Sequence, residues 1–164
     1  SDTAAMITRV HAEMNKRYKQ IEENGAKDFR DLSATLPALM IMINETSYLL
    51  STTGSKSDEG KMEDSLREEM KYQLADIARL GHAAGIPLVF STERMDSNSF
   101  PATFKEDFTT RIAFGRMQAI DSQLLLGSDK TKEWAGAIKG RGYFQQFGEG
   151  YDFQAYYADK DLNI

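Results

Sequence analysis

An unbroken run of apolar residues at positions 38–43 (ALMIMI) constrains the fold more than any other feature of this sequence. A strand that is apolar on both faces is typical of the middle of a parallel sheet, where helices cover each side. Two further short runs, 86–90 (IPLVF) and 110–114 (TRIAF), are strand candidates of the same kind. We therefore expect an α/β fold with a mainly parallel sheet flanked by helices.

Two long segments show the spacing of amphipathic helices. Apolar side chains recur every three or four positions in residues 4–24 and again in residues 61–84. We expect the first helix to end at Gly25 and the second at Gly85. Residues 51–59 (STTGSKSDE) predict a mobile surface loop between the first strand and the second helix. The order strand, long helix, strand, connector, strand favours parallel crossovers.

The C-terminal part predicts a different arrangement. Residues 142–147 and 151–157 flank Gly148-Glu149-Gly150, which is typical of a β-hairpin with a three-residue glycine turn. Apolar and polar residues alternate along the second arm, as in a half-buried strand. The many aromatic side chains of this hairpin favour a packed core, and the alternative is an exposed face that stacks nucleic-acid bases.

Composition limits the chemistry that the chain can carry. The 164 residues include no Cys and only 2 His, which argues against thiol catalysis, disulfides, iron–sulfur clusters and zinc sites. A net charge of −5 argues against a domain that coats nucleic acid by bulk charge alone. No apolar run approaches the ~18–20 residues of a membrane span. We expect one cytoplasmic domain, residues 1–164.

Two sets of polar residues follow the first two strands, where ligands bind in open parallel sheets. Asn44 and Glu45 come directly after the first strand, and Thr92, Glu93 and Arg94 follow the second. An apolar strand that ends in an acidic pair is the Walker B arrangement, in which one carboxylate holds the magnesium shell and the next polarises water. The alternative is that Asn44 and Glu45 only cap the strand and begin a turn.

No phosphate-binding loop accompanies this pattern in the sequence. A P-loop requires GxxxxGK[ST], whereas residues 54–62 (GSKSDEGKM) have one residue too many between the glycines and lack the final hydroxyl. We expect any P-loop to lie on another part of the parent protein. Four basic residues near a glycine-rich loop are candidates for contact with a phosphate backbone, the alternative being a solvated surface: Lys130, Lys132, Lys139 and Arg141.

Several segments share their order and spacing with the motifs of one known family. Residues 77–114 contain a small-residue helix, AAGI, an apolar strand, STERM at the place of the family's ATQRP, and TRIAF. Residues 14–19 (MNKRYK) match the MerRY helix, and a Leu-Pro pair precedes the first strand as in LP-hhhh-DE. Residues 119–122 and 140–144 match KIDSR and the closing G-GDMLY strand. Over about residues 6–158 the chain thus resembles the FtsK/SpoIIIE family of DNA translocases.

This resemblance implies the second half of a RecA-like P-loop NTPase motor domain. Residues 1–35 would form the leading helix and loop, 36–115 the Walker B and sensor strands, and 116–164 a helix and the C-terminal hairpin. Such motors assemble as a ring, here expected to be a hexamer, and use ATP and Mg²⁺ to drive double-stranded DNA through its centre. The fragment by itself would be catalytically incomplete, and the parent protein is either cytoplasmic throughout or membrane-anchored.

The resemblance also implies roles for individual residues. Glu45 matches the catalytic Glu, and Arg111 is our candidate for an arginine finger that reaches a neighbour's nucleotide, a contact that contributes ~10³–10⁵ in rate. Asn44 and Glu45 would hold the metal. Contacts to the nucleotide would come from the residues at the two strand ends, namely Asn44, Thr92, Glu93 and Arg94.

Three positions depart from the family pattern. Asn44 replaces the Walker B Asp, Glu93 replaces the sensor Gln, and Gln123 replaces the Arg of IDSR. Loss of one preorganised charge of this kind typically costs ~10²–10³ in turnover. Two alternatives therefore stay open: a degenerate, non-catalytic RecA-like domain of a type VII secretion-type ATPase that binds a protein substrate, and an unrelated α/β binding module.

Overall fold

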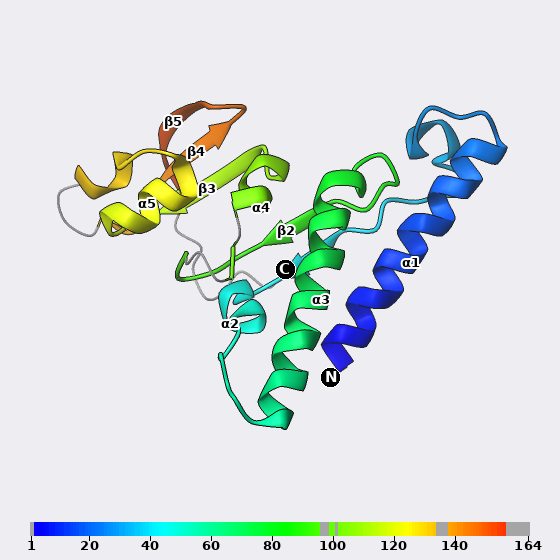
Figure 1. The fold of residues 1–164 in the computed structure, drawn as a ribbon. Coiled ribbons are helices and arrows are strands. Elements are labelled where there is room, and N and C mark those ends of the chain that lie inside the picture. The colour runs from blue at the N-terminus through cyan, green and yellow to red at the C-terminus, as the bar shows by residue number, and fades with distance from the viewer. Residues whose placement is uncertain (1, 96–98, 101, 134–137, 157–164) are drawn as a thin grey trace, which may run out of the picture. The chain divides into compact units, whose positions relative to one another are not determined.

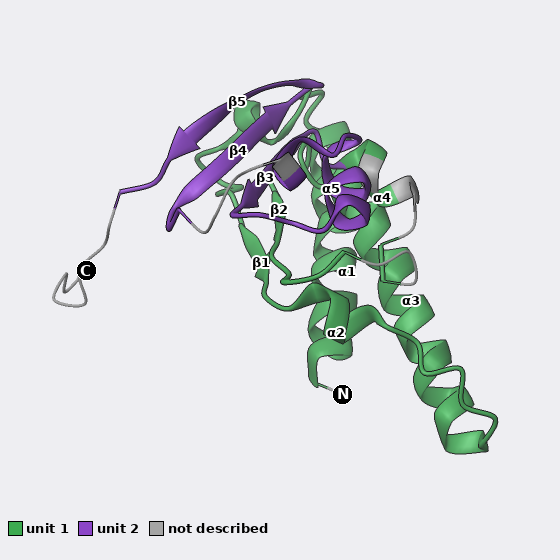
Figure 2. Cartoon of the chain, turned by 90° about the vertical axis from the view of Figure 1, so that its left-hand side faces the viewer, with its two compact units in different colours: residues 1–107 green, residues 108–164 purple. Residues whose placement is uncertain are grey.

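The computed structural model describes residues 2–95, 99–100, 102–133 and 138–156. The chain divides into two compact units, residues 1–107 and 108–164, which are coloured separately in Figure 2 and are described one at a time below. Both helices and strands occur in each unit (Figure 1), so the predicted α/β class is confirmed.

The first unit contains most of the helices. Its elements in chain order are α1 (Asp2–Glu23), η1 (Phe29–Leu32), β1 (Ile41–Ile43), α2 (Thr46–Leu50), α3 (Asp58–Leu80), β2 (Leu88–Phe90) and α4 (Ala102–Asp107).

The two long helices, α1 and α3, run side by side and form the core of this unit (Figure 1). Their buried apolar residues recur at the predicted helical spacing: Ile7, Val10, Met14 and Ile21 on α1, and Met70, Leu74 and Ile77 on α3. Polar pairs cross the same interface, including His11 Nε2 and Asp76 Oδ2 at 3.0 Å. Both predicted helices are therefore confirmed.

The ends of the helices follow from local hydrogen bonds. Helix α3 begins at Asp58, earlier than predicted, because the Ser57 hydroxyl accepts a hydrogen bond from the Gly60 amide and caps it. It ends at Leu80, and a turn continues to Gly85, which has the left-handed φ of +72°. Helix α1 ends before Gly25, as predicted.

Strands β1 and β2 form a parallel pair, with Ile41, Met42 and Ile43 opposite Leu88, Val89 and Phe90. The predicted strand at 38–43 is shortened to its last three residues. Ile43 is buried, whereas Met42 is 72% exposed. Successive side chains of a strand point to opposite faces. In the described residues of the first unit by itself, one face of the pair is therefore covered and the other is open, whereas the sequence predicted cover on both faces.

The second unit is built on an antiparallel sheet. Its elements are β3 (Thr110–Phe114), α5 (Ala119–Leu126), η2 (Lys130–Glu133), β4 (Arg141–Gln146) and β5 (Glu149–Gln154). The strand order is β3-β4-β5, and Thr110 pairs with Gln146. Residues 110–114 therefore do not form the parallel crossover strand that we predicted. After α5 the chain returns along β3 in the opposite direction, which fixes an antiparallel pair.

The C-terminal hairpin is confirmed, but its turn differs from the prediction. Gln146 pairs with Glu149, so the loop contains only Phe147 and Gly148. Both have positive φ, +50° and +86°. This is the condition for a type I′ turn, whose twist matches that of the flanking strands. Sequence reasoning expected a three-residue loop because it counted Glu149 and Gly150 outside the strand.

Phe144, Tyr151 and Phe153 of the hairpin share one face of the sheet, where they are exposed or half-buried, so the predicted packed core is wrong for these three side chains. Tyr151 is 62% exposed and stacks on Phe144 at 5.2 Å between ring centroids. Phe153 meets Phe114 edge-on at 5.4 Å. The opposite face carries the buried Ala113 and, paired with it, the half-buried Tyr143, and α5 contacts β3. Tyr157, the last residue of the predicted strand, lies outside the described residues.

Candidate functional site

The carboxyl ends of β1 and β2 are tied together by hydrogen bonds that continue past the strands. The Ser91 amide donates to the Ile43 carbonyl at 2.9 Å, and the Thr46 amide donates to the Ser91 carbonyl at 3.1 Å. The Ser91 hydroxyl donates to Oδ1 of Asn44. The structure therefore brings the two predicted sets of site residues, which begin at Asn44 and Thr92, to one edge of the parallel pair.

Glu45 has an unusual backbone conformation at this edge. Its φ and ψ of 52° and 45° are left-handed, a conformation that costs about 1–2 kcal/mol for a residue other than glycine. It precedes α2 as the N-cap residue, but its side chain makes no capping hydrogen bond and is exposed. The fully buried Thr46 holds this bend, because its hydroxyl lies 3.0 Å from the Ile43 carbonyl oxygen and 3.2 Å from that of Ser91.

Thr92 is fixed in place, whereas Glu93 and Arg94 are exposed. The Thr92 hydroxyl donates to the Arg94 carbonyl at 2.8 Å, which closes a tight turn after β2. The same hydroxyl lies 2.7 Å from Oγ of Ser47, the second residue of α2. The end of β2 is therefore held directly by the helix that follows Glu45.

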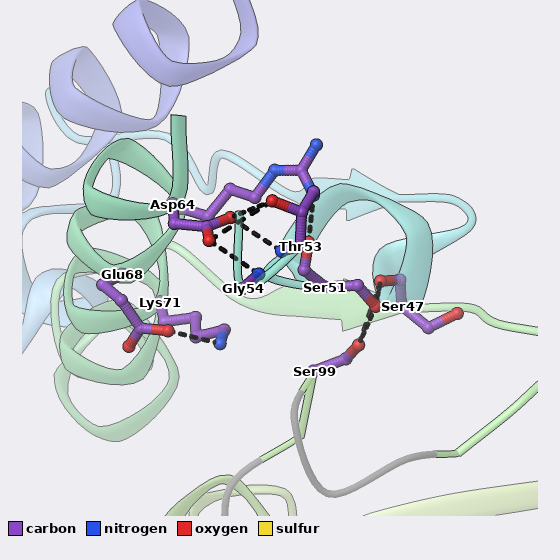
Figure 3. Close-up of polar contacts among 9 residues, drawn as sticks. Ser47, Ser51, Thr53, Gly54, Asp64, Glu68, Lys71 and Ser99 are labelled. Atoms are coloured by element: carbon purple, nitrogen blue, oxygen red, sulfur yellow. Dashed lines mark hydrogen bonds and ion pairs between the residues drawn. The ribbon is translucent and has the colours of Figure 1, made fainter. Parts of the chain in front are cut away.

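Sequence reasoning missed the hydroxyl groups that extend from this contact. Ser47, Ser51 and Ser99 form a cluster in which the Ser51 and Ser99 hydroxyls lie 2.6 Å apart (Figure 3). Ser99 is fully buried. The signal in the sequence is the density of Ser and Thr between residues 46 and 53, directly after the Walker B-like strand. Residues 51–53 of that stretch belong to the segment for which the sequence predicts a mobile loop.

That loop is organised by an acidic side chain of α3 (Figure 3). The Asp64 carboxylate accepts hydrogen bonds from the amides of Thr53 at 2.7 Å and Gly54 at 2.9 Å. These bonds favour the charged form and lower the pKa of Asp64. The neighbouring Arg67 guanidinium donates to the Ser51 carbonyl. The loop is therefore more ordered than its composition predicts.

The arginine of the MNKRYK segment has a structural role in this unit. Arg17 is buried, and its Nη1 donates to the carbonyls of Pro37 at 2.9 Å and Ala84 at 3.2 Å. Its Nε donates to Glu13 at 3.1 Å. Pro37 and Ala84 precede β1 and β2, so Arg17 fixes the approach of both strands to the sheet.

Arg111 belongs to the second unit, and its role as a finger stays a prediction. It is the second residue of β3, and its Nε donates to the Phe108 carbonyl at 3.0 Å. Within the same unit, Arg141 of the predicted basic cluster pairs with Asp152 at 2.9 Å. Lys130 Nζ lies 5.9 Å from the centre of the Tyr143 ring. The candidate site is thus built from the first unit alone.

A magnesium ion at this edge would need ligands beyond the His, Cys, Asp and Glu side chains of the described residues. Among the described residues, no three His, Cys, Asp or Glu side chains converge on one point. Mg²⁺ at nucleotide sites is usually held by one or two protein ligands together with phosphate oxygens and water. The exposed Glu45 carboxylate and the Asn44 amide oxygen fit that limited contribution.

The chain is similar to known proteins in both sequence and fold. No protein-family model matches the chain. The DNA translocase FtsK of Pseudomonas aeruginosa is 27% identical over 145 residues, which is 81% of this chain. FtsK of Caulobacter vibrioides is 32% identical over 101 residues, or 62% of the chain. The chain is related to the FtsK/SpoIIIE-type DNA translocases. It spans 16% and 11% of the length of these two proteins.

Solved structures extend the relationship to the fold. The pCW3 conjugation coupling protein TcpA, in its monomer form with ATPγS, superposes with a TM-score of 0.83 at 28% identity. The match covers 98% of this chain and 46% of TcpA. The type VII secretion ATPase EccC of Thermomonospora curvata has a TM-score of 0.73 at 22% identity, covering 97% of this chain and 18% of its own, and shows the fold alone. The chain therefore has the α/β fold of part of a RecA-like P-loop ATPase core.

Proposed function

We propose that this chain is part of an ATP-driven translocase of double-stranded DNA and supplies the strand ends that meet the nucleotide. The observation that carries the proposal is the joined edge of β1 and β2, where Ser91 bonds to Asn44 beside the exposed Glu45. Relationship to the FtsK proteins supports DNA as the cargo. TcpA, whose structure was solved with ATPγS, supports a nucleotide at this fold.

The proposed roles follow the chemistry of phosphoryl transfer. Glu45 orients the attacking water, and Asn44 and Glu45 contribute to the Mg²⁺ shell. When bound, Mg²⁺ neutralises charge that develops on the phosphate oxygens. Thr92, with Glu93 and Arg94 beside it, faces the nucleotide from the end of β2. Arg111 is proposed to act on the nucleotide of a neighbouring subunit.

The proposed motor is complete only as an assembly. The sequence contains no P-loop, so another part of the parent protein supplies the phosphate cradle. We propose a hexameric ring in the cytoplasm through which double-stranded DNA passes. Among the described residues, no helix is both long and apolar enough to span a bilayer. Exposed Lys132 and Lys139 of the second unit are proposed contacts for the DNA backbone.

The test is DNA-stimulated ATP hydrolysis by the complete parent protein. Glu45→Gln removes the water-orienting carboxylate and should lower kcat by at least about 10²-fold. Glu22→Gln, a matched change on an exposed position of α1, should leave kcat unchanged. Equal activity of the two variants would contradict the role of Glu45. The 164-residue chain alone should show no Mg²⁺-dependent ATPase activity above background.

One observation favours a second candidate function. Asn44 presents a neutral amide where a motor places a carboxylate, and its oxygen already accepts the Ser91 hydroxyl. A degenerate, non-catalytic RecA-like domain of a type VII secretion-type ATPase, which binds a protein substrate, would tolerate this arrangement. Duplex DNA binding by the complete protein separates the two candidates. A translocase should lose affinity steeply as salt rises, whereas the second candidate predicts no such slope.

A further inference from the structure

Ser47 stands at the junction between the two halves of the candidate site. It is the second residue of α2 and lies two positions after Glu45. Its hydroxyl is 2.7 Å from the Thr92 hydroxyl, which belongs to the segment after β2. Its carbonyl oxygen lies 2.7 Å from the hydroxyl oxygen of Ser51 and 3.0 Å from that of Ser99 (Figure 3). The backbone carbonyl of Ser47 therefore contacts Ser51 and Ser99, while its hydroxyl contacts Thr92.

The direction of the Ser47–Thr92 hydrogen bond follows from counting hydrogens. A threonine hydroxyl has one hydrogen to donate. Thr92 donates this hydrogen to the Arg94 carbonyl, which can only accept. The bond between the two hydroxyls therefore requires Ser47 to be the donor and Thr92 the acceptor. A continuous chain of hydrogen bonds results, in which Ser47 donates to Thr92 and Thr92 donates to the Arg94 carbonyl.

We propose that Ser47 is a positioning residue that presents the Thr92 hydroxyl to a phosphate oxygen of the nucleotide. The inference rests on the proposed function, because it assigns Thr92 a phosphate to bind. A phosphate oxygen, like the Arg94 carbonyl, only accepts hydrogen bonds. Thr92 reaches it by turning its hydrogen away from Arg94, while Ser47 keeps hold of the Thr92 oxygen. Donation from Ser47 also polarises Thr92 and makes it a stronger donor.

The same contact gives Ser47 a role in the geometry of the whole site. Glu45, Thr46 and Ser47 are consecutive, and the last two bond to the segment after β2 through Ser91 and Thr92. A shift of α2 therefore moves Glu45 and Thr92 together. In this account, Ser47 keeps the water-orienting carboxylate and the phosphate-binding hydroxyl in register.

The first test uses the purified chain and needs no catalysis. NMR of the Thr92 methyl group reports its environment and its side-chain rotamer. In Ser47→Ala the Thr92 resonance should shift and its coupling constants should move toward rotamer averaging. Ser47→Thr, which keeps the hydroxyl, should restore both. Ser65→Ala, an exposed position on α3, is the matched control and should change neither. An unmoved Thr92 methyl in Ser47→Ala would overturn the proposal.

The second test uses ATP hydrolysis by the complete protein. Ser47→Ala should lower kcat by about three- to tenfold, the effect of losing one hydrogen bond, with KM for ATP unchanged. Ser47→Thr should recover most of the rate. An active wild type with an equally active Ser47→Ala would overturn this inference alone. An inactive wild type would instead overturn the proposed function, and the NMR result would still decide whether Ser47 holds Thr92.

Discussion

The two compact units hold their sheets together in different ways. The parallel pair of β1 and β2 extends over only three residues in each strand, and side chains beyond the strand ends add bonds from Thr46, Ser91 and Asn44. In the second unit, β4 pairs over six residues with β5, and aromatic rings on the sheet surface pair with one another. A short parallel pair needs support from outside its ladder. In this chain the supporting groups are those that shape the candidate site.

Removing the support at the strand ends should have the largest effect on stability. Thr46→Val keeps the shape of a fully buried side chain but removes the hydroxyl that bonds to the Ile43 and Ser91 carbonyls. The free energy of unfolding should fall by about 2 kcal/mol, because buried carbonyl oxygens lose a partner. Urea unfolding measures this change in the free energy of unfolding. Thr109→Val, at an exposed position, is the control, and an equal loss in both variants would contradict the account.

The second unit should instead be sensitive to crowding on its aromatic face. A Cβ on Gly142 would lie 2.2 Å from the Phe153 ring, so Gly142→Ala must displace the ring from Phe114. We expect a loss of about 1–2 kcal/mol in the protection of β4 and β5 amides, measured by hydrogen exchange. Gly148→Asn, where the added Cβ meets open space, should cost less. Equal protection in Gly142→Ala and the wild type would show that Phe153 is not fixed there.

The left-handed backbone of Glu45 should make the stability of the first unit depend on which residue occupies this position. Glycine adopts the left-handed conformation freely, whereas alanine does not. Glu45→Gly should therefore be more stable than Glu45→Ala by about 1 kcal/mol in urea unfolding, although both lack the carboxylate. Neither variant should support ATP hydrolysis by the complete protein. Equal stability of the two variants would show that φ at this position is not positive in solution.

The smallest effect concerns the loop that Asp64 organises. Its amide donors, Thr53 and Gly54, lower the pKa of Asp64 in the folded state. A lowered folded pKa means that Asp64 stabilises the fold above its ordinary pKa of 3.8, and that this contribution is lost as pH falls through the folded value. The Thr53 and Gly54 amide resonances should titrate with a midpoint below 3.8. A midpoint at or above 3.8, or an unchanged titration in Asp64→Asn, would contradict this arrangement.

Part of the fold was predictable because it depends on local pattern. Apolar spacing located α1 and α3, and the polar residues after two apolar runs located the joined edge of β1 and β2. The pairing of β3 was not predictable in this way. TRIAF is compatible with a parallel or an antiparallel partner, and only the return of the chain through α5 decides between them.

The candidate site shows a similar division. Position after a strand identified Asn44, Glu45 and Thr92, but it could not reveal that Glu45 is left-handed or that Ser47 bonds to Thr92. The Ser47–Thr92 contact joins residues 45 positions apart, and no periodicity records such a pair. Arg17 is a related case. The MNKRYK motif that contains Arg17 could be recognised in the sequence. Its hydrogen bonds to the Pro37 and Ala84 carbonyls could be seen only in the structure.

The central claim is that the joined ends of β1 and β2 face the terminal phosphate of a nucleotide. A structure of the complete protein with ATPγS and Mg²⁺ tests it most directly. We predict that a γ-phosphate oxygen lies within hydrogen-bonding distance of the Thr92 hydroxyl, with Glu45 on the side of the attacking water. A nucleotide bound at another edge of the sheet, with Thr92 still donating to Arg94, would contradict the claim.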